Sequence, residues 1–353
     1  MIPLVVPASS EASARFVTRL VDGPAGEHES SLVERSADVA LYTGLNGLFS
    51  ITSNQQMLGD VVCIDPSRRT AERLIRANSP HNTFLITEQC DQLCVMCSQP
   101  PKKRHDNRFD EYRDAIRLAP VGAVIGLSGG EPTLHKQALF ALLAEAKEDR
   151  PDLYFHILSN GQHFEASDLP DIRSSSANCL WGIPLYGPEP EIHDAIVAKQ
   201  GAYDRLMESM AHCLSGGMRI ELRTVLLRDN FKALPSLARL VADHFGFVSQ
   251  WSIMQLENIG FAKQRFDTLY VDHGREFGPV AEAIDVAALF GVDVALFNMP
   301  LCSIPAAYRS YAANSISDWK RKYAADCADC VEQPNCPGFF AWHPETKMRV
   351  APL

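Results

Sequence analysis

The sequence predicts an α/β protein built on a parallel sheet, because apolar strand-like runs alternate with helical patterns from Thr83 onward. The runs lie at 84–87, 123–127, 153–158, 180–185, 220–227 and 251–256. The helical patterns include two apolar stripes, Leu139-Leu142-Leu143-Ala146 and Leu206-Met210-Cys213-Leu214. A last predicted helix over 276–290 leads to a further run at 292–297. Six such strand–helix units predict a sheet that is either barrel-like or doubly wound.

The composition sets the protein class. A chain of 353 residues predicts about two domains, and its 46% apolar and 22% charged residues exclude disordered and fibrous folds. No run approaches the roughly 18 apolar residues of a spanning helix, and residues 1–7 lack the basic flank of a secretory signal. The net charge of −10 disfavours a general phosphate-binding surface. We therefore expect a cytoplasmic protein with neither a nucleic-acid nor a membrane partner.

Three regions are predicted along the chain. Residues 1–80 form a small β-rich domain, because short alternating runs at 14–21, 39–43, 48–52 and 61–64 are separated by turn-rich stretches such as 22–26. The strand–helix region follows at 81–298, and a cysteine-rich extension occupies 299–353.

The ten cysteines are unevenly distributed, and without a secretion signal they indicate thiols that hold metal or do chemistry. One set comprises Cys90, Cys94 and Cys97, and a second comprises Cys302, Cys327, Cys330 and Cys336. We expect the scattered Cys63, Cys179 and Cys213 to be core thiols. The chain therefore predicts two metal sites.

Three unusual loops follow successive predicted strands. The first cysteine set follows 84–87, Ser128-Gly129-Gly130-Glu131-Pro132 follows 123–127, and Ser159-Asn160-Gly161 follows 153–158. Ligands of parallel sheets bind at the carboxyl ends of the strands, so these loops are predicted to converge on one face.

The first cysteine set lacks a fourth local ligand. Thiolates suit zinc or iron–sulfur clusters, and a structural zinc site closes with four protein ligands. Three thiolates on a cubane cluster leave one iron open. The alternatives are a zinc site completed by a distant ligand, or thiols that simply pack in the core.

Cys-Asp-Gln-Leu-Cys-Val-Met-Cys at 90–97, together with Gly129-Gly130-Glu131-Pro132, resembles the radical S-adenosylmethionine (SAM) superfamily. The resemblance implies a partial (β/α)6 TIM-like barrel in which Cys90, Cys94 and Cys97 are the catalytic set that holds a 4Fe-4S cluster. The open iron would chelate SAM, whose reductive cleavage gives a 5′-deoxyadenosyl radical that abstracts hydrogen from substrate.

The resemblance also implies further SAM contacts. Gly129, Gly130, Glu131 and Pro132 match the turn that binds the SAM amino group, with Glu131 as acceptor, although a glycine turn alone is a weak signal. Ser159 and Asn160 match the loop beside the ribose. Arg223 matches a partner of the SAM carboxylate, with a solvated strand-end arginine as the alternative. Asn258 and Met96 match positions near the adenine; Met96 departs from the usual aromatic residue there.

The second cysteine set can close a site without an open position. The resemblance implies an auxiliary 4Fe-4S cluster held by Cys302, Cys327, Cys330 and Cys336, and zinc fits the ligand count as well. A helix that includes Trp319 is predicted within this extension.

A finer resemblance is to the radical SAM maturases of the His-Xaa-Ser peptide system, of the HxsC type. It rests on residues 87–102, 183–187, 191–194, 316–320 and 336–340, and covers about 60–340. It implies a ribosomally made peptide substrate with His-Xaa-Ser repeats, a second radical SAM partner subunit and an external low-potential electron donor. Alternatives are a small-molecule or RNA substrate, or a non-catalytic cluster-bearing subunit. We expect His193 and Asp194 to cap a helix start, and the basic run 100–105 to be a solvated connector.

Overall fold

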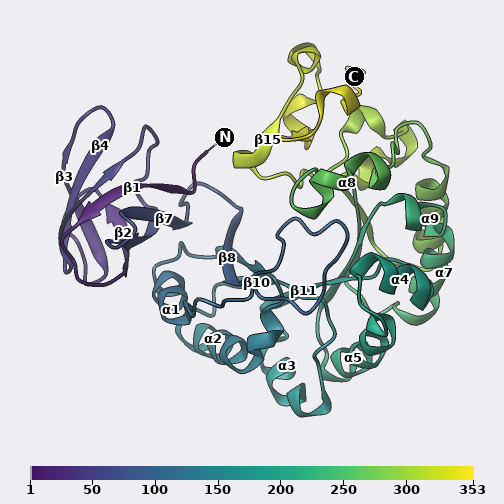
Figure 1. Ribbon diagram of the computed structural model, residues 1–353, viewed down its shortest axis with the longest axis horizontal. Helices are drawn as coiled ribbons and strands as arrows, with labels where there is room; N and C mark the ends of the chain where they lie inside the picture. The colour runs from purple at the N-terminus through teal and green to yellow at the C-terminus, as the bar shows by residue number, and fades with distance from the viewer. Residues whose placement is uncertain (1) are drawn as a thin grey trace.

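The computed structural model describes residues 2–353 as an N-terminal β-barrel, a parallel sheet with helices and a C-terminal extension (Figure 1). The N-terminal barrel comprises β1 (Val5–Ser10), β2 (Phe16–Val21), β3 (Glu29–Arg35), β4 (Val39–Gly44), β5 (Gly47–Thr52), β6 (Val61–Asp65) and β7 (Thr70–Ile75). Its strand order is β1-β5-β4-β3-β2-β6-β7, and it closes because β1 pairs with both β5 and β7.

The sequence located only part of this barrel. The runs at 14–21, 39–43, 48–52 and 61–64 correspond to β2, β4, β5 and β6, whereas β1, β3 and β7 were not predicted. Polar residues or a proline interrupt the apolar alternation in the three missed strands, which read VVPASS, ESSLVER and TAERLI. The barrel has its own core, which includes Leu20, Tyr42, Phe49, Ile51 and Ile64.

The second unit is a parallel sheet in the order β14-β13-β12-β11-β10-β9-β8. Its strands are β8 (Asn82–Thr87), β9 (Val124–Gly129), β10 (Tyr154–Leu158), β11 (Cys179–Pro184), β12 (Ile220–Val225), β13 (Gln250–Met254) and β14 (Val294–Phe297). The predicted parallel sheet is confirmed, but it has seven strands because the run at 292–297 joins it as β14. The sheet does not close on itself, which fits a partial barrel.

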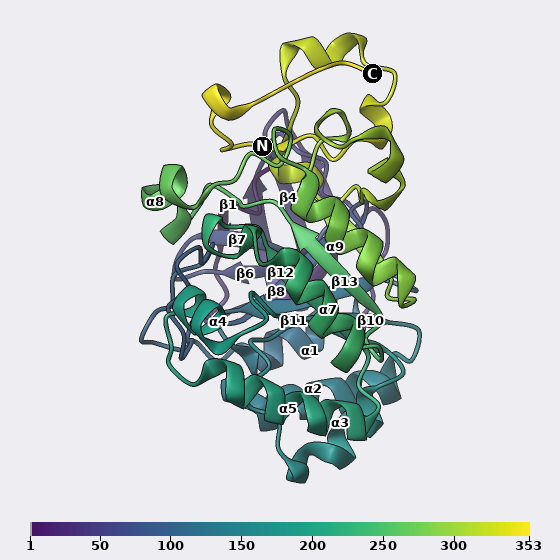
Figure 2. The ribbon, with the colours of Figure 1, turned by 90° about the vertical axis from the view of Figure 1, so that its right-hand side faces the viewer.

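The helices are α1 (Phe109–Arg117), α2 (Lys136–Asp149), α3 (Leu169–Ser175), α4 (Pro190–Val197), α5 (Ala202–Gly216), α6 (Arg228–Phe231), α7 (Leu234–His244), α8 (Phe261–Leu269) and α9 (Gly278–Leu289). Most of them pack around the outer side of this sheet, whereas α8 and the end of α4 pack with the cysteine segment in a separate cluster (Figures 1 and 2). The predicted stripes of α2 and α5 lie in one core with strand residues such as Ile157, Trp181 and Trp251, Leu214 excepted, which is exposed. A proline starts α4, where its missing N–H costs no hydrogen bond, and Gly217 in the left-handed region ends α5.

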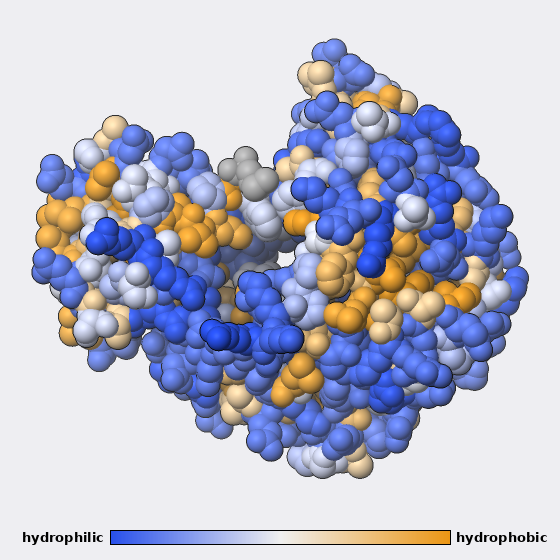
Figure 3. Space-filling view, viewed as in Figure 1, coloured by the Kyte–Doolittle hydropathy of each residue, from blue (hydrophilic) through white to orange (hydrophobic). Residues whose placement is uncertain are grey.

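The extension consists of short turns around a two-stranded pair, β15 (Arg321–Lys322) and β16 (Phe339–Phe340). The predicted helix at Trp319 is wrong: only the single 3-10 turn Asp318–Lys320 forms there. Arg76, in the connection from the N-terminal barrel, donates to Asp318 at 2.6 Å and ties the extension to the first unit. Figure 3 shows a notch between the N-terminal barrel and the extension. Across residues 2–353, no helix has the length and apolarity to cross a membrane.

Candidate active site

The first cysteine set lies on the irregular segment after β8, which docks on the end of α4. Leu93 N donates to Val197 O at 3.2 Å, and Val95 N donates to Ile196 O at 2.9 Å. These two bonds satisfy carbonyls that the last turn of a helix leaves without intrahelical partners. The loop is therefore held by backbone groups rather than by its own regular structure.

A second anchor reaches the loop from the segment after β13. Phe261 N donates to Cys97 O at 2.9 Å, and Gly260 lies beside the same carbonyl with φ of 58°. A Cβ at Gly260 would lie 2.2 Å from Cys97 O. Only glycine permits both this backbone conformation and this approach.

Asp91 connects the loop to two other strand ends. Its carboxylate accepts from Asn160 Nδ2 at 2.8 Å, contacts Lys199 Nζ, and lies 3.3 Å from His163 Nε2. Burial alone would raise the pKa of Asp91, but the hydrogen bonds and charges of His163 and Lys199 hold it well below its usual range. Asp91 therefore stays ionised and fixes the start of the cysteine loop.

The three thiols of this loop are partly buried and influence one another. Burial raises the pKa of Cys90 to about 11 and that of Cys94 to about 12, and neighbouring acidic groups add to both shifts. Burial also raises the pKa of Cys97. Free thiols here keep their protons at neutral pH, so metal binding must release protons. Gln92 N donates to Cys90 Sγ at 3.4 Å, the kind of contact that stabilises a metal-bound sulfur.

The glycine turn after β9 is packed against the cysteine segment. Gly129 has φ of 136°, and a Cβ there would lie 2.0 Å from Thr87 O. A Cβ at Gly130 would lie 2.0 Å from Gln89 O. The two glycines are thus required by the close approach of protein backbone to protein backbone, whereas the sequence assigned them to the approach of SAM.

Glu131 differs from its predicted role. Its side chain is fully buried, and Oε1 accepts from Thr133 N at 2.9 Å, Thr133 Oγ1 at 2.5 Å and Ser159 Oγ at 2.8 Å. Oε2 accepts from Asn160 N at 2.5 Å. The carboxylate joins the turn after β9 to the loop after β10 and is not exposed to a ligand. Contacts of this turn with the SAM amino group would therefore come from its backbone, which continues into a 3-10 turn whose first two residues, Pro132 and Thr133, are buried.

The side chains of the loop after β10 also form hydrogen bonds within the protein. Ser159 Oγ donates to Glu131 and accepts from Gly161 N at 3.0 Å, and Asn160 Oδ1 accepts from Gln162 N at 3.1 Å. Both side chains are buried. Their expected contact with ribose would again fall to the backbone of this loop.

The other predicted SAM contacts lie around the same edge of the sheet. Met96 is 7% exposed and packs with Tyr186 and Leu256, so most of its surface already contacts protein. Asn258 donates from Nδ2 to Trp342 O at 3.2 Å, and its buried Oδ1 has no partner among residues 2–353. Arg223 on β12 donates to Glu221 Oε2 at 3.1 Å and contacts Met254 Sδ at 3.3 Å.

The second cysteine set lines one cavity in the extension. The thiols of Cys302, Cys327, Cys330 and Cys336 all border it, and tail residues such as Pro352 and Leu353 form another wall. Backbone N–H groups point at the sulfurs: Gly338 N lies 3.4 Å from Cys336 Sγ, and Leu353 N lies 3.4 Å from Cys330 Sγ. Within the described part of the chain, no three Cys, His, Asp or Glu side chains surround a point suited to a single ion.

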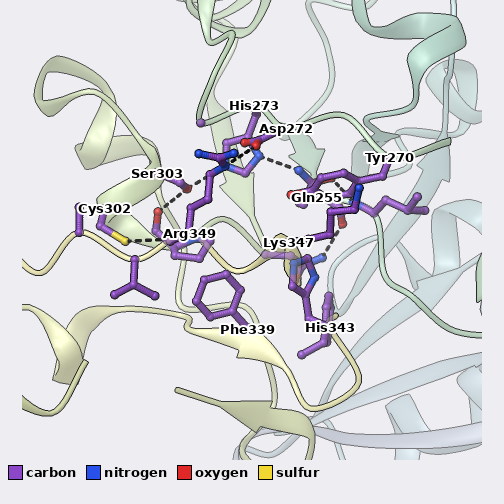
Figure 4. A pocket seen from close by; sticks show the side chains of 17 residues that line it. Gln255, Tyr270, Asp272, His273, Cys302, Ser303, Phe339, His343, Lys347 and Arg349 are labelled. Carbon is purple, nitrogen blue, oxygen red and sulfur yellow. Dashed lines mark hydrogen bonds and ion pairs between the residues drawn. The ribbon is translucent and has the colours of Figure 1, made fainter. Parts of the chain in front are cut away.

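A pocket of about 270 Å³ lies between the ends of β13 and β14 and the extension (Figure 4). Gln255 Nε2 lies 2.6 Å from His273 Nδ1, and His273 Nε2 lies 2.8 Å from Ser303 Oγ. Arg349 faces Asp272 at 2.7 Å across the mouth. Burial lowers the pKa of His273 to about 4, so the imidazole is neutral at pH 7. Cys302 borders both this pocket and the cavity of the second cysteine set.

The structure gives structural roles to several residues for which the sequence predicted no catalytic role. Asp194 accepts from Gly201 N at 2.5 Å and Tyr203 N at 2.8 Å, so it caps the start of α5 although it lies inside α4. His193 is fully buried and accepts from Tyr186 N at 3.3 Å. Lys102, in the basic run, is exposed and pairs with Glu88. The side chains of Cys63, Cys179 and Cys213 are buried in the core.

Sequence analysis missed a polar cluster on the inner face of the sheet. His156 Nε2 lies 2.7 Å from Glu221 Oε2, which Arg223 also contacts. The sequence feature that could have revealed this cluster is a polar residue at every second position of an otherwise apolar strand. His156 stands in this way within YFHIL, and Glu221 and Arg223 do so within IELRTV. Alternation of period two places such residues on the face opposite the apolar core.

Curated relatives include Fe-coproporphyrin III synthase of Methanosarcina barkeri, 25% identical over 51% of this chain and 47% of the relative. AdoMet-dependent heme synthase of Nitratidesulfovibrio vulgaris is 24% identical over 50% of this chain and 48% of the relative. The chain thus spans about half the length of these relatives.

The fold is also found among solved structures. Streptococcus suis SuiB bound to S-adenosylmethionine matches with a TM-score of 0.52 and 12% identity, over 63% of this chain and 51% of SuiB. The Radical SAM superfamily matches residues 84–241, from β8 through most of α7. This range contains all three loops at the carboxyl ends of β8, β9 and β10. Residues 84–241 are therefore similar to the radical SAM superfamily domain.

Proposed function

We propose that this chain is an enzyme that cleaves SAM reductively and uses the resulting radical to abstract hydrogen from a substrate. The observation that carries the proposal is the meeting of three motif loops at one edge of the parallel sheet, joined by Glu131 and Asp91. Cys90, Cys94 and Cys97 would hold the cluster. When bound, a 4Fe-4S cluster with one open iron supplies the electron that cleaves SAM to methionine and a 5′-deoxyadenosyl radical.

The chain's own residues fit such a group. Three thiols on one loop provide the soft ligands that iron–sulfur clusters prefer. Gln92 Nε2 and Asn258 Oδ1 are buried beside this region without hydrogen-bond partners among the described residues, a costly arrangement that a polar ligand would relieve. The N–H groups of the turn after β9 and the loop after β10 already donate within the protein, for example Gly130 N to Thr87 O at 2.7 Å, so contacts with SAM here would use backbone carbonyl oxygens.

Anaerobic reconstitution with iron and sulfide tests the proposal. The wild-type chain should form 5′-deoxyadenosine from SAM under a low-potential reductant, and Cys94→Ala should abolish it. Retained SAM cleavage in Cys94→Ala would contradict the assignment. Cys213→Ala, a buried cysteine on α5 outside both sets, is the control and should retain activity.

The proposed substrate is a ribosomally made peptide with His-Xaa-Ser repeats. Support comes from the sequence resemblance, and the acidic chain, with net charge −10, is compatible with a histidine-bearing peptide. Mass spectrometry of a repeat peptide co-expressed with this chain should detect a mass change that depends on Cys94. An unchanged peptide in the presence of active SAM cleavage would count against this substrate.

A tetrapyrrole is the rival substrate, because both curated relatives are named for heme or coproporphyrin synthesis. Parallel incubations with the repeat peptide, coproporphyrin III and RNA separate the three substrate classes. The pocket beside β13 and β14 has Lys347 and Arg349 in its lining, where they pair with Asp267 at 3.0 Å and Asp272 at 2.7 Å, so a substrate carboxylate would have to compete with these partners.

The extension is proposed to hold an auxiliary 4Fe-4S cluster, with zinc as the alternative. Four thiols on one cavity and the N–H groups aimed at their sulfurs support a metal–thiolate site. We also propose an external low-potential electron donor and a second radical SAM partner subunit. SAM turnover by the purified chain alone would count against a non-catalytic subunit role, whereas a strict requirement for a second chain would favour it.

A further inference from the structure

The inner face of the parallel sheet carries polar side chains where a filled barrel would carry branched apolar ones. His156 lies on β10, Glu221 and Arg223 on β12, and Ser252 on β13. Their chain neighbours face the helices and belong to the main core; these are Phe155, Ile157, Ile220, Leu222, Trp251 and Ile253. Because side chains alternate along a strand, the polar set faces the inside of the partial barrel.

Glu221 is the centre of this set. Its side chain is 2% exposed, and Oε2 lies 2.7 Å from His156 Nε2 and 3.1 Å from Arg223 Nη1. Gly182 makes room for the contact, since a Cβ there would lie 2.9 Å from Arg223 Cδ and 3.3 Å from His156 Nε2. Burial would raise the pKa of Glu221, but the hydrogen bond from His156 and the charge of Arg223 hold it at about 2. Glu221 is therefore ionised at neutral pH.

An ionised carboxylate can only accept hydrogen bonds, so His156 must carry a proton on Nε2. In the neutral ring, Nδ1 then has a free lone pair. The His156 side chain is 31% exposed, and its Nδ1 has no protein partner within residues 2–353. The imidazole is thus held through Nε2 by Glu221, while Nδ1 makes no hydrogen bond to the described part of the protein.

A purely structural role explains this arrangement poorly. Glu221 Oε1 is buried without a hydrogen bond of normal geometry among the described residues, and the nearby Ser252 hydroxyl helps to lower the pKa of this carboxyl. Structural carboxylates in a core normally have both oxygens satisfied. The cluster is also well placed for chemistry. His156 lies two residues before the end of β10, and Ser159, on the loop predicted to lie beside SAM, follows that strand.

We propose that His156 accepts a proton from the substrate at Nδ1, and that Glu221 is the residue that positions it. The proton of a substrate X–H bond moves to Nδ1, and the electron pair of that bond stays on the substrate. The imidazolium that forms is stabilised by the ionised Glu221, and it later releases the proton to solvent. This inference rests on the proposed function, because it requires the substrate to be modified at this edge of the sheet.

The experiment separates proton transfer from SAM cleavage. The reconstituted full chain is assayed with the repeat peptide and with coproporphyrin III, and 5′-deoxyadenosine and modified product are quantified together. In His156→Gln, product should fall about 100-fold or more, in the range of general acid–base effects, while 5′-deoxyadenosine formation stays within about twofold of wild type. His244→Gln, an exposed histidine at the end of α7, is the matched control and should change neither quantity.

Two further measurements distinguish catalysis from structure. Product formation by His156→Ala should be restored at least in part by added imidazole, which a structural defect would not allow. In the protein without substrate, ¹⁵N NMR should show the His156 ring as the Nε2–H tautomer, and Glu221→Gln should lose this preference. Product formation by His156→Gln at the wild-type rate, or an Nδ1–H tautomer in the wild type, would overturn the proposal. Absence of 5′-deoxyadenosine in the wild type would instead count against the proposed function.

Discussion

Replacing Glu131 with glutamine should loosen the joint between the loops after β9 and β10. The carboxylate accepts four hydrogen bonds, three at Oε1 from Thr133 and Ser159 and one at Oε2 from Asn160 N. Glutamine keeps one acceptor oxygen and replaces the other with an NH₂ group. If the oxygen stays with the three donors, the NH₂ group meets Asn160 N–H, and one buried donor loses its partner.

The magnitude follows from that one site. A hydrogen bond to a charged group contributes about 1.5–3 kcal/mol, and a buried donor left without a partner costs about 1–3 kcal/mol. The two figures describe partly the same loss and are not simply added. We therefore expect Glu131→Gln to lower the free energy of unfolding of the sheet unit by about 2–4 kcal/mol. This corresponds to a decrease in Tm of roughly 4–16 °C for a unit of this size.

Calorimetry of the full chain measures this change, and SAM binding by titration calorimetry should weaken in parallel because the two loops lose their common anchor. Glu148→Gln, at an exposed position of α2, is the control and should change stability by less than about 0.5 kcal/mol. Burial raises the pKa of Glu131 above its ordinary value, and the four donors offset this rise only in part. A Glu131→Gln protein as stable as wild type would refute the argument, because it would mean that residue 131 is protonated and already behaves as a neutral group.

Three other perturbations test the site. Glu221 has a pKa of about 2 in the folded chain against an ordinary 4.5, so it contributes about 3 kcal/mol to the free energy of unfolding above pH 4.5, and this contribution is lost as pH falls toward 2. The free energy of unfolding of Glu221→Gln should therefore fall less steeply with decreasing pH than that of wild type. Equal slopes in the two proteins would contradict the ion pair. Gly260→Ala should reduce the iron content of the first site, because the new Cβ would collide with Cys97 O. Gly217→Ala is the control, since Gly217 has φ of 70° and no atoms near its Cβ position, and it should lower stability without changing the iron content. Equal iron content in the two variants would oppose this reasoning. Iron analysis should find about eight irons per chain, with about half lost in Cys94→Ala and the other half in Cys327→Ser; an unchanged iron content in Cys327→Ser would exclude the auxiliary cluster.

The strands of the parallel sheet could be predicted from the sequence because they are buried on the helix-facing side and read as apolar runs. The apolar run at 292–297 likewise predicted β14, although the expected barrel of six strand–helix units did not include this strand. The strands of the N-terminal barrel were predicted only where the apolar alternation was unbroken. The residues of β3, ESSLVER, obtain their place from pairing with the neighbouring strands β2 and β4, which their own largely polar pattern does not indicate.

The cysteine loop was apparent from spacing alone, because local spacing constrains which thiols can share a cluster. The roles of the neighbouring motif residues were less accessible. Glu131 and Asn160 carry residue types suited to a ligand, yet the fold uses both side chains to join loops. Which of several polar groups is used in internal hydrogen bonds depends on distances between segments 29 and 69 residues apart in the chain.

The amino-acid order by itself determined the alternation of strands and helices, the two cysteine sets and the loops that carry the first of them. Tertiary structure alone decided that Glu131 joins two loops through internal hydrogen bonds, and that His156 meets Glu221 inside the sheet. The physical reason is that periodicity reports which face of an element is buried, whereas the partner found on that face depends on how separate elements pack.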